Sequence, residues 1–230
     1  MNRKIIKDLS KHIKDVYNVE LEEIKGYQDF VNNLDDLILD YYFGWHTERK
    51  QGNKFASYWQ QQLNFELRQT GKPMIDKILA MGDVKVLDVG CGTNELKSYI
   101  PNLIGIDPYN EKADLLVSIL DYIAPEEYDV VCVLGSINFG SPDVIKKNVE
   151  RVATYCKPGG TIFWRCNPGI THDHPRATMI DFYEWTHEQL AEWGDELGYD
   201  TVDTGYDHPE NAEYIRWGNR LYAEWRKRTT

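Results

Sequence analysis

The chain has 230 residues, of which 42% are hydrophobic and 27% charged, and its formal net charge is −11. This composition is that of a folded protein whose core needs no disulfide or metal. Residues 81–230 account for the whole negative net charge, with 25 acidic and 14 basic residues, whereas residues 1–80 carry 12 of each. An acidic body repels phosphate backbones, so a nucleic-acid substrate is disfavoured.

The cell compartment is suggested by two features. The chain starts without an apolar leader segment, and no apolar run approaches the roughly 18 residues needed to span a bilayer. The four cysteines have no metal-binding spacing, and three of them fall in strand-like runs. We therefore expect a cytoplasmic protein with reduced cysteines and no membrane partner.

Residues 1–80 show the periodicity of amphipathic helices, with apolar side chains recurring every three or four positions. From residue 84 the pattern changes to short, continuous apolar runs that alternate with helical segments. Such runs are typical of strands buried on both faces of a parallel sheet. The seven runs are Val84–Val89, Leu103–Ile106, Leu115–Val117, Tyr128–Leu134, Thr161–Arg165, Thr201–Tyr206 and Arg220–Trp225.

Helix start signals lie between the last of these runs. Ser141 precedes Pro142, and the segment 186–189 reads as a capping box. The sequence thus predicts an α/β fold: a Rossmann-like, seven-stranded, mostly parallel sheet flanked by helices over residues 81–230, preceded by a helical extension over residues 1–80.

The most informative segment is Val86-Leu-Asp-Val-Gly-Cys-Gly-Thr93, which leaves the first strand. Gly90 and Gly92 allow the backbone to approach a ligand closely. Asp107 ends the next strand, 19 positions after Asp88, where a carboxylate can accept hydrogen bonds from both hydroxyls of a ribose. The spacing indicates a ligand of the adenosine type.

Over residues 84–226 the sequence resembles the class I S-adenosylmethionine-dependent methyltransferases. Its closely spaced motifs are also similar to those of methyltransferase-like proteins of phages. The resemblance implies methyl transfer with S-adenosylmethionine as cofactor. It makes Asp107 the ribose ligand and Asp121-Tyr122 the pair that recognises adenine. The implied cofactor-binding residues are Asp88, Gly90, Cys91, Gly92, Asp107, Pro108, Asp121, Tyr122, Leu134 and Gly135.

Two departures from the family pattern stand out. Asn94 occupies the position of a third glycine, and Asp121 follows Asp107 by only 14 positions, so the helix usually found between them is expected to be shortened or lost. A nicotinamide-binding Rossmann domain is the nearest alternative. The G-x-G-x-x-G motif of such domains has its third glycine where this chain has Glu95, an acid that would repel a pyrophosphate.

The acceptor and the catalytic groups are less well specified. His172 and His174 are candidates for a general base, for metal ligands with Asp173, or for solvated loop residues; we assign no metal. Ser136 and Asn138 either hold the acceptor or cap the next helix. Trp45 and His46 suit a lid over the acceptor or plain helix packing, and Lys54 and Tyr58 are candidates for the methionine carboxylate of the cofactor.

The leading interpretation is an enzyme that methylates an O or N atom of a small molecule. One alternative is a catalytically silent module that binds S-adenosylmethionine or a protein partner through the same fold. Another is an RNA methyltransferase that uses the basic segments 3–14 and 47–54. The sequence does not identify the acceptor. A homodimer is possible.

Overall fold

In the computed structural model the chain forms two compact units, Met1–Phe55 and Ala56–Thr230. The structure describes residues 70–167, 183–207 and 220–229, all of them in the second unit. The predicted helical extension lies outside the described residues except for its last part, so its boundary at residue 80 stays a prediction.

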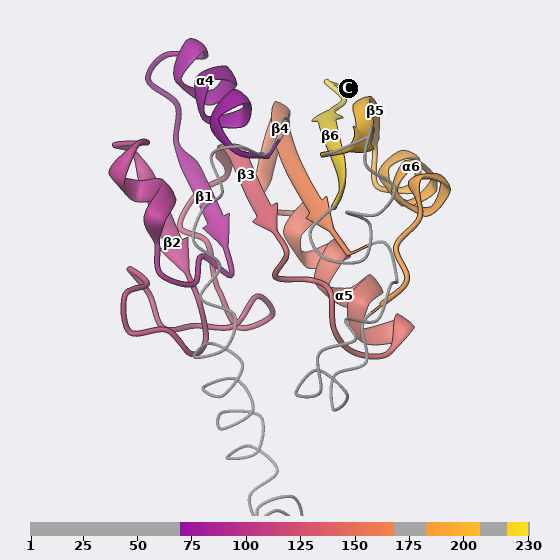
Figure 1. Ribbon diagram of the computed structural model, residues 1–230, viewed down its shortest axis with the longest axis horizontal. Helices are drawn as coiled ribbons and strands as arrows, with labels where there is room; N and C mark the ends of the chain where they lie inside the picture. Colours follow the sequence, from indigo (N-terminus) through magenta and orange to yellow (C-terminus); the bar gives the residue numbers. More distant parts are fainter. Residues whose placement is uncertain (1–69, 168–182, 208–219, 230) are drawn as a thin grey trace, which may run out of the picture. The chain divides into compact units, whose positions relative to one another are not determined.

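The centre of this unit is a six-stranded sheet in the order β2-β1-β3-β4-β6-β5 (Figure 1). The strands β2, β1, β3 and β4 are parallel to one another, and β6 runs antiparallel to both β4 and β5. The strands span Val86–Val89 (β1), Leu103–Ile106 (β2), Tyr128–Leu134 (β3), Cys156–Cys166 (β4), Tyr199–Tyr206 (β5) and Leu221–Lys227 (β6).

The prediction of a strand at Leu115–Val117 is wrong. Of these residues only Leu115 pairs with the sheet, in a single parallel bridge to Ile106. The connection from β2 to β3 contains no helix, as the short spacing predicted. Instead, Asp114 attaches it to the edge of the sheet: its carboxylate accepts the Gly105 N–H and its own N–H binds the Gly105 carbonyl.

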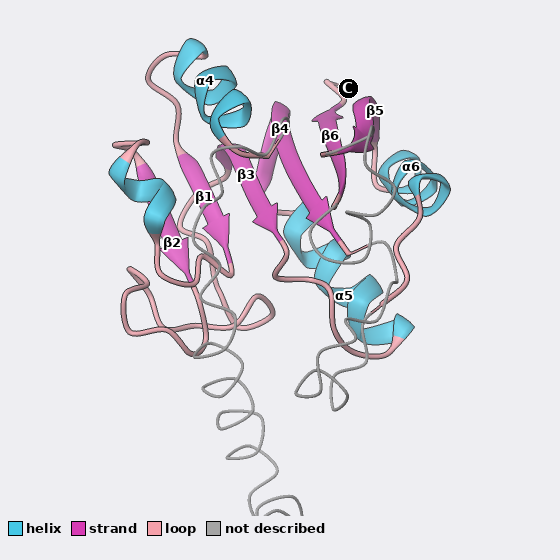
Figure 2. Ribbon diagram, in the orientation of Figure 1, coloured by secondary structure: helices cyan, strands magenta, loops and turns pink. Residues whose placement is uncertain are grey.

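Helices cover both faces of the sheet (Figure 2). The helix α4 (Lys72–Ala80) and the short 3-10 helix η2 (Glu95–Ser98) pack with Val86, Val130 and Phe163 in one core cluster. The helices α5 (Pro142–Ala153) and α6 (His187–Glu196) belong to a larger cluster on the other face. That cluster contains the buried tryptophans Trp164, Trp185, Trp193 and Trp225.

The predicted helix starts are found where the sequence placed them. Pro142 opens α5, and the Thr186 side chain accepts a hydrogen bond from the Gln189 N–H at 3.1 Å to cap α6. Because β1, β2, β3 and β4 are parallel, their carboxyl ends meet at one edge of the sheet. The sequence-predicted cofactor loop leaves the sheet at that edge.

Close backbone packing toward the amino end of β4 leads to a first prediction. A Cβ added to Gly160 would lie 2.7 Å from Cys156 Sγ, 2.8 Å from the Asp129 carbonyl oxygen and 2.9 Å from that of Lys157. We expect Gly160→Ala to lower the free energy of unfolding in urea by about 1–3 kcal/mol. Adding Cys156→Ala removes the sulfur but neither carbonyl, so the double variant should stay destabilised; full recovery would contradict the role of the backbone.

Candidate functional site

The loop after β1 is attached to the end of β2 by one carboxylate. Asp107 accepts the Gly92 N–H on Oδ2 at 3.1 Å, and the N–H groups of Tyr109 and Asn110 on Oδ1 at 2.8 and 2.9 Å. These bonds fold the chain around Pro108 and hold the glycine loop against the neighbouring strand. Asp107 therefore stands where the sequence predicted, with an additional structural task.

The two loop glycines differ in what surrounds them. Both have a positive φ, +69° at Gly90 and +54° at Gly92. A Cβ on Gly90 would lie 2.2 Å from the Ser136 Cβ, whereas a Cβ on Gly92 would meet no atom of the described residues within 4 Å. Gly90 thus allows the turns after β1 and β3 to touch, and Gly92 has no neighbour on that side among the described residues.

The loop is surrounded by negative charge. Asp88, the third residue of β1, is 4% exposed, and burial raises its pKa to about 7, with Arg165 opposing and Asp107 adding to the shift. Burial and the carboxylates of Asp88, Asp107 and Asp114 raise the pKa of the Cys91 thiol far above its ordinary value. Cys91 is therefore a neutral thiol at physiological pH, and the loop suits a cationic ligand better than a pyrophosphate.

Asn94 replaces the third glycine without loss of the loop geometry. Its φ is +59°, in the left-handed region that asparagine tolerates. Its Nδ2 donates to the Lys112 carbonyl and to Asp114 Oδ2. The departure from the family pattern therefore ties the loop to the β2–β3 connection.

A second group of polar residues follows β3 and β4. Arg165 Nη2 donates to the Leu134 carbonyl at 3.0 Å, and Asn138 Nδ2 donates to the Gly135 carbonyl at 3.0 Å. Asn138 Oδ1 accepts the Asn167 N–H at 2.9 Å. Asn138 thus fixes the turns after β3 and β4 to each other, and its side chain makes no cap to α5.

The predicted adenine pair is not brought to this edge. The Tyr122 ring is buried in the core, its hydroxyl is hydrogen-bonded to that of Tyr128, and its carbonyl accepts Tyr155 Oη. Tyr128 opens β3, about 20 Å along the strand from its carboxyl end. The geometry therefore assigns Tyr122 to packing. The neighbouring Asp121 is exposed and accepts a hydrogen bond from Ser118.

Six of the predicted site residues lie outside the described residues, and their assignments stay predictions. They are Trp45, His46, Lys54, Tyr58, His172 and His174.

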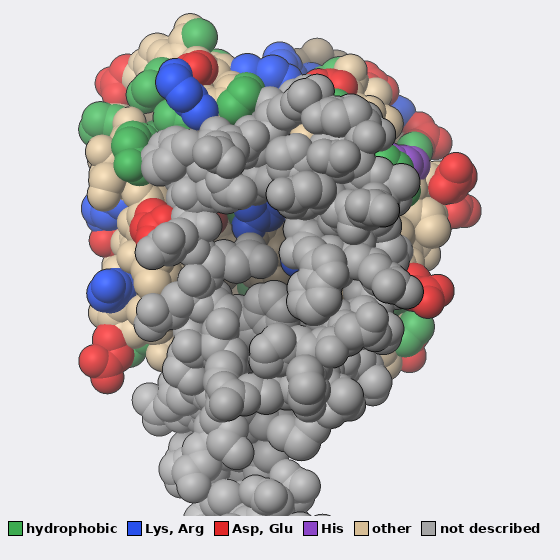
Figure 3. All heavy atoms as spheres, viewed as in Figure 1, with side chains coloured by type: hydrophobic (Ala, Val, Ile, Leu, Met, Phe, Trp, Pro, Cys, Tyr) green, Lys and Arg blue, Asp and Glu red, His purple; other side chains and the backbone are tan. Residues whose placement is uncertain are grey.

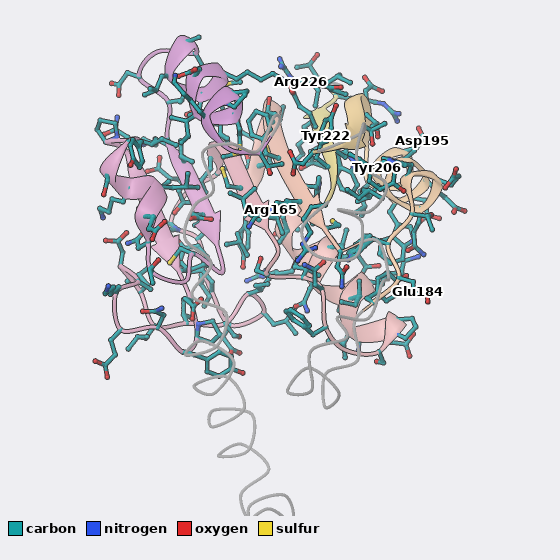
Figure 4. All side chains as sticks on the ribbon, in the orientation of Figure 1. Arg165, Glu184, Asp195, Tyr206, Tyr222 and Arg226 are labelled. Atoms are coloured by element: carbon teal, nitrogen blue, oxygen red, sulfur yellow. The ribbon has the colours of Figure 1, made fainter. Side chains whose placement is uncertain are left out.

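Sequence reasoning missed a group of buried charges near the same edge. Arg165, Asp207 and Arg220 are all at least nine-tenths buried, and Figure 4 shows Arg165 beside β3 and β4. The one available signal was a basic residue at the end of an otherwise apolar strand, in the run Thr161–Arg165.

No protein-family model and no curated protein matches the chain. Solved structures do match. A Burkholderia thailandensis 1,6-didemethyltoxoflavin N1-methyltransferase, bound to 1,6-didemethyltoxoflavin and S-adenosylhomocysteine, is 15% identical with a TM-score of 0.57; the match covers 78% of this chain and 85% of that one. The Synechocystis magnesium protoporphyrin IX methyltransferase with bound S-adenosylhomocysteine is 16% identical with a TM-score of 0.55, covering 84% and 98%.

The [4+2]-cyclase SpnF also matches, at 14% identity and a TM-score of 0.51, covering 75% of this chain and 86% of that one. Together the matches show that this chain has the fold of the class I S-adenosylmethionine-dependent methyltransferases. At these identities they establish the fold, and the chemistry has to be argued from the site.

The raised pKa of Asp88 leads to a second prediction. Between the ordinary pKa of 3.8 and about 7, the native state binds more protons than the unfolded chain, so Asp88 makes stability fall as pH rises through this window. Asp88→Asn should remove that slope. Compared with the wild type, the variant should gain on the order of 1–3 kcal/mol in free energy of unfolding between pH 5 and pH 8. Parallel pH profiles of the two proteins in urea would contradict the assignment.

Proposed function

We propose that the protein binds S-adenosylmethionine at the carboxyl ends of β1 and β2 and transfers its methyl group to an O or N atom of a small molecule. The observation that carries the proposal is the glycine loop held by the Asp107 carboxylate, in which Gly92 has no neighbour on its Cβ side among the described residues. The class I methyltransferase fold supports it.

The residues present fit this cofactor. Asp107 Oδ2 accepts a single hydrogen bond from the described residues, so it retains acceptor capacity for a ribose hydroxyl. The open side of Gly92 gives room for close approach. Asp107 places a carboxylate beside the loop, and S-adenosylmethionine carries a sulfonium and an ammonium but no phosphate.

The sulfonium, when bound, supplies a methyl group on a good leaving group. The protein then has to orient the acceptor in line with that methyl and to exclude water. The described loop residues offer no activated nucleophile, since the Cys91 thiol is neutral, and direct transfer requires none. Acceptors that must lose a proton need a base, and His172 and His174 remain our candidates for it.

A small acceptor is favoured over RNA. The chain carries a net charge of −11, and on the described part of the face in Figure 3 acidic and basic side chains are interspersed. Two proteins of the same fold are named for small-molecule acceptors, 1,6-didemethyltoxoflavin and magnesium protoporphyrin IX. Within the described ranges, no helix combines the length and the apolar character that crossing a membrane requires.

The match to a cyclase favours one alternative, in which this protein has the methyltransferase fold but transfers no methyl group. Calorimetry with S-adenosylhomocysteine, followed by transfer of a labelled methyl group into pools of small metabolites, separates the two. Binding with turnover supports the enzyme, binding without turnover supports a silent cofactor-binding module, and absence of binding refutes the enzyme and leaves a module that acts through protein contacts.

A third prediction concerns Asp107. Asp107→Asn keeps one side-chain oxygen but loses the charge, so we expect binding of S-adenosylhomocysteine to weaken about 10- to 100-fold. Calorimetry gives the affinity, and a thermal melt shows whether the loop's own bonds to Asp107 survive. Unchanged affinity in a folded variant would show that the ribose lies elsewhere.

A fourth prediction separates the glycines. Gly92→Ala puts a methyl group into open space at a positive φ, which costs about 1–2 kcal/mol of stability, and we expect it to weaken S-adenosylhomocysteine binding at least tenfold. Gly90→Ala meets Ser136 instead and should lower the melting temperature more than Gly92→Ala does. If Gly92→Ala retains full affinity in calorimetry, the ligand does not approach the backbone there.

A further inference from the structure

We propose that the protein has a second binding site, independent of the proposed methyl transfer, which takes a free α-amino acid with an apolar side chain. The site is a cavity of about 240 Å³ on the α5 side of the sheet. Its lining residues lie in two segments, 123–127, which leads into β3, and 151–155, which joins α5 to β4.

The cavity lies at the opposite edge of the sheet from the cofactor loop. Glu127 directly precedes β3 and Tyr155 directly precedes β4, so both mark the amino ends of parallel strands. The carboxyl end of β3 is about 20 Å away along the strand. The cavity is smaller than the roughly 300–1,000 Å³ of pockets that hold drug-sized ligands, so it suits a small molecule.

Arg151 provides a cation in the wall of the cavity. Its Nη2 donates to the Tyr122 carbonyl at 2.6 Å, and its Cζ lies 5.4 Å from the centroid of the Tyr155 ring. Among the described residues no carboxylate forms an ion pair with Arg151, and its Nε is buried without a hydrogen-bond partner. A buried donor without a partner is costly, and the paired N–H groups of a guanidinium match the two oxygens of a carboxylate. Arg151 therefore favours a ligand with a carboxylate.

Two acids line the same cavity. Glu126 forms an ion pair with Lys85 at 2.5 Å, and Glu127 lies 3.8 Å from Lys227. Both glutamate side chains are more than half exposed, so each keeps acceptor capacity beyond its lysine. The helix α5 also ends here, and the carboxyl end of a helix carries partial negative charge. This side of the cavity favours an ammonium group.

The remaining wall is apolar. Ile123 and Ala124 line the cavity together with Tyr155. Ile123 is 83% exposed, so a ligand side chain that covers it removes apolar surface from water. A carboxylate, an ammonium group and an apolar side chain on one small molecule are the features of a free amino acid such as leucine, valine or methionine.

The cofactor also has an amino-acid end, at its methionine. The distance of about 20 Å between the cavity and the carboxyl end of β3 favours a separate ligand. Competition with S-adenosylhomocysteine distinguishes the two sources.

The test measures binding of leucine, valine and methionine to the whole chain by calorimetry. Each is compared with its carboxamide, which lacks the carboxylate, and with its N-acetyl derivative, which lacks the ammonium group. We expect at least one amino acid to bind tenfold or more tightly than both of its derivatives. Saturation with S-adenosylhomocysteine should leave this affinity unchanged.

A first pair of variants tests the carboxylate contact. Arg151→Gln should abolish the preference for the amino acid over its carboxamide, and the Tyr122 carbonyl would still accept Tyr155 Oη at 3.1 Å. Arg226→Gln, the same substitution at an exposed arginine of β6 (Figure 4), should keep the preference.

A second pair serves even if Arg151→Gln fails to fold. Ile123→Asp changes a side chain that is 83% exposed and has little packing to lose, and it places a carboxylate in the apolar wall. It should weaken binding of the amino acid at least tenfold. Leu116→Asp, at a 57% exposed residue outside the cavity, should leave binding unchanged.

Four outcomes would overturn the inference. If no amino acid binds more tightly than its carboxamide, Arg151 receives no carboxylate. If the N-acetyl derivatives bind equally well, the ligand is a simple acid. If S-adenosylhomocysteine displaces the amino acid, the amino acid occupies the cofactor site. If the affinity survives Ile123→Asp, and Arg151→Gln where that variant folds, the amino acid binds elsewhere. Absence of S-adenosylhomocysteine binding would instead refute only the proposed function.

Discussion

The candidate site depends on the carboxylate of Asp107. A loop at the end of a parallel strand has backbone N–H groups that no strand partner satisfies, and here three of them point to one side chain. The bonds join the ends of β1 and β2 and turn the chain away from the sheet. They also hold the Asp107 carboxylate beside Gly92. The same group therefore folds the loop and is positioned for the cofactor role that we propose for it.

How far the sequence predicted this arrangement depended on whether the signal was local. The strands β1 to β4, the glycine loop and Asp107 were all recognisable, because a continuous apolar run followed by glycines and an acid has one ordinary structural meaning. The run Leu115–Val117 has the same composition but forms only one bridge. Its pairing depends on how Asp114 attaches the connection, which periodicity does not report.

The predictions that failed or were missed concern contacts between distant parts of the chain. The family resemblance of Asp121-Tyr122 implied an adenine-binding role for Tyr122, yet its ring is buried against Tyr128 and Tyr155. Gly90 and Gly92 looked equivalent, and only the approach of Ser136 distinguishes them. The closeness of Arg165 and Arg220 arises because β6 inserts next to β4, 55 positions further along the chain. Antiparallel pairing at that separation leaves no trace in local composition.

Across the carboxyl edge the described charges are mixed. Asp88 and Asp107 lie at β1 and β2, and the buried Arg165 and Arg220 lie with the buried Asp207 by β4 to β6. Methyl transfer from a sulfonium leaves a neutral thioether. A carboxylate beside the sulfonium would therefore hold the cofactor before the reaction and lose part of that attraction after it. The same fold in a cyclase shows that the sheet alone does not impose this chemistry, so the side chains at its carboxyl edge must decide it.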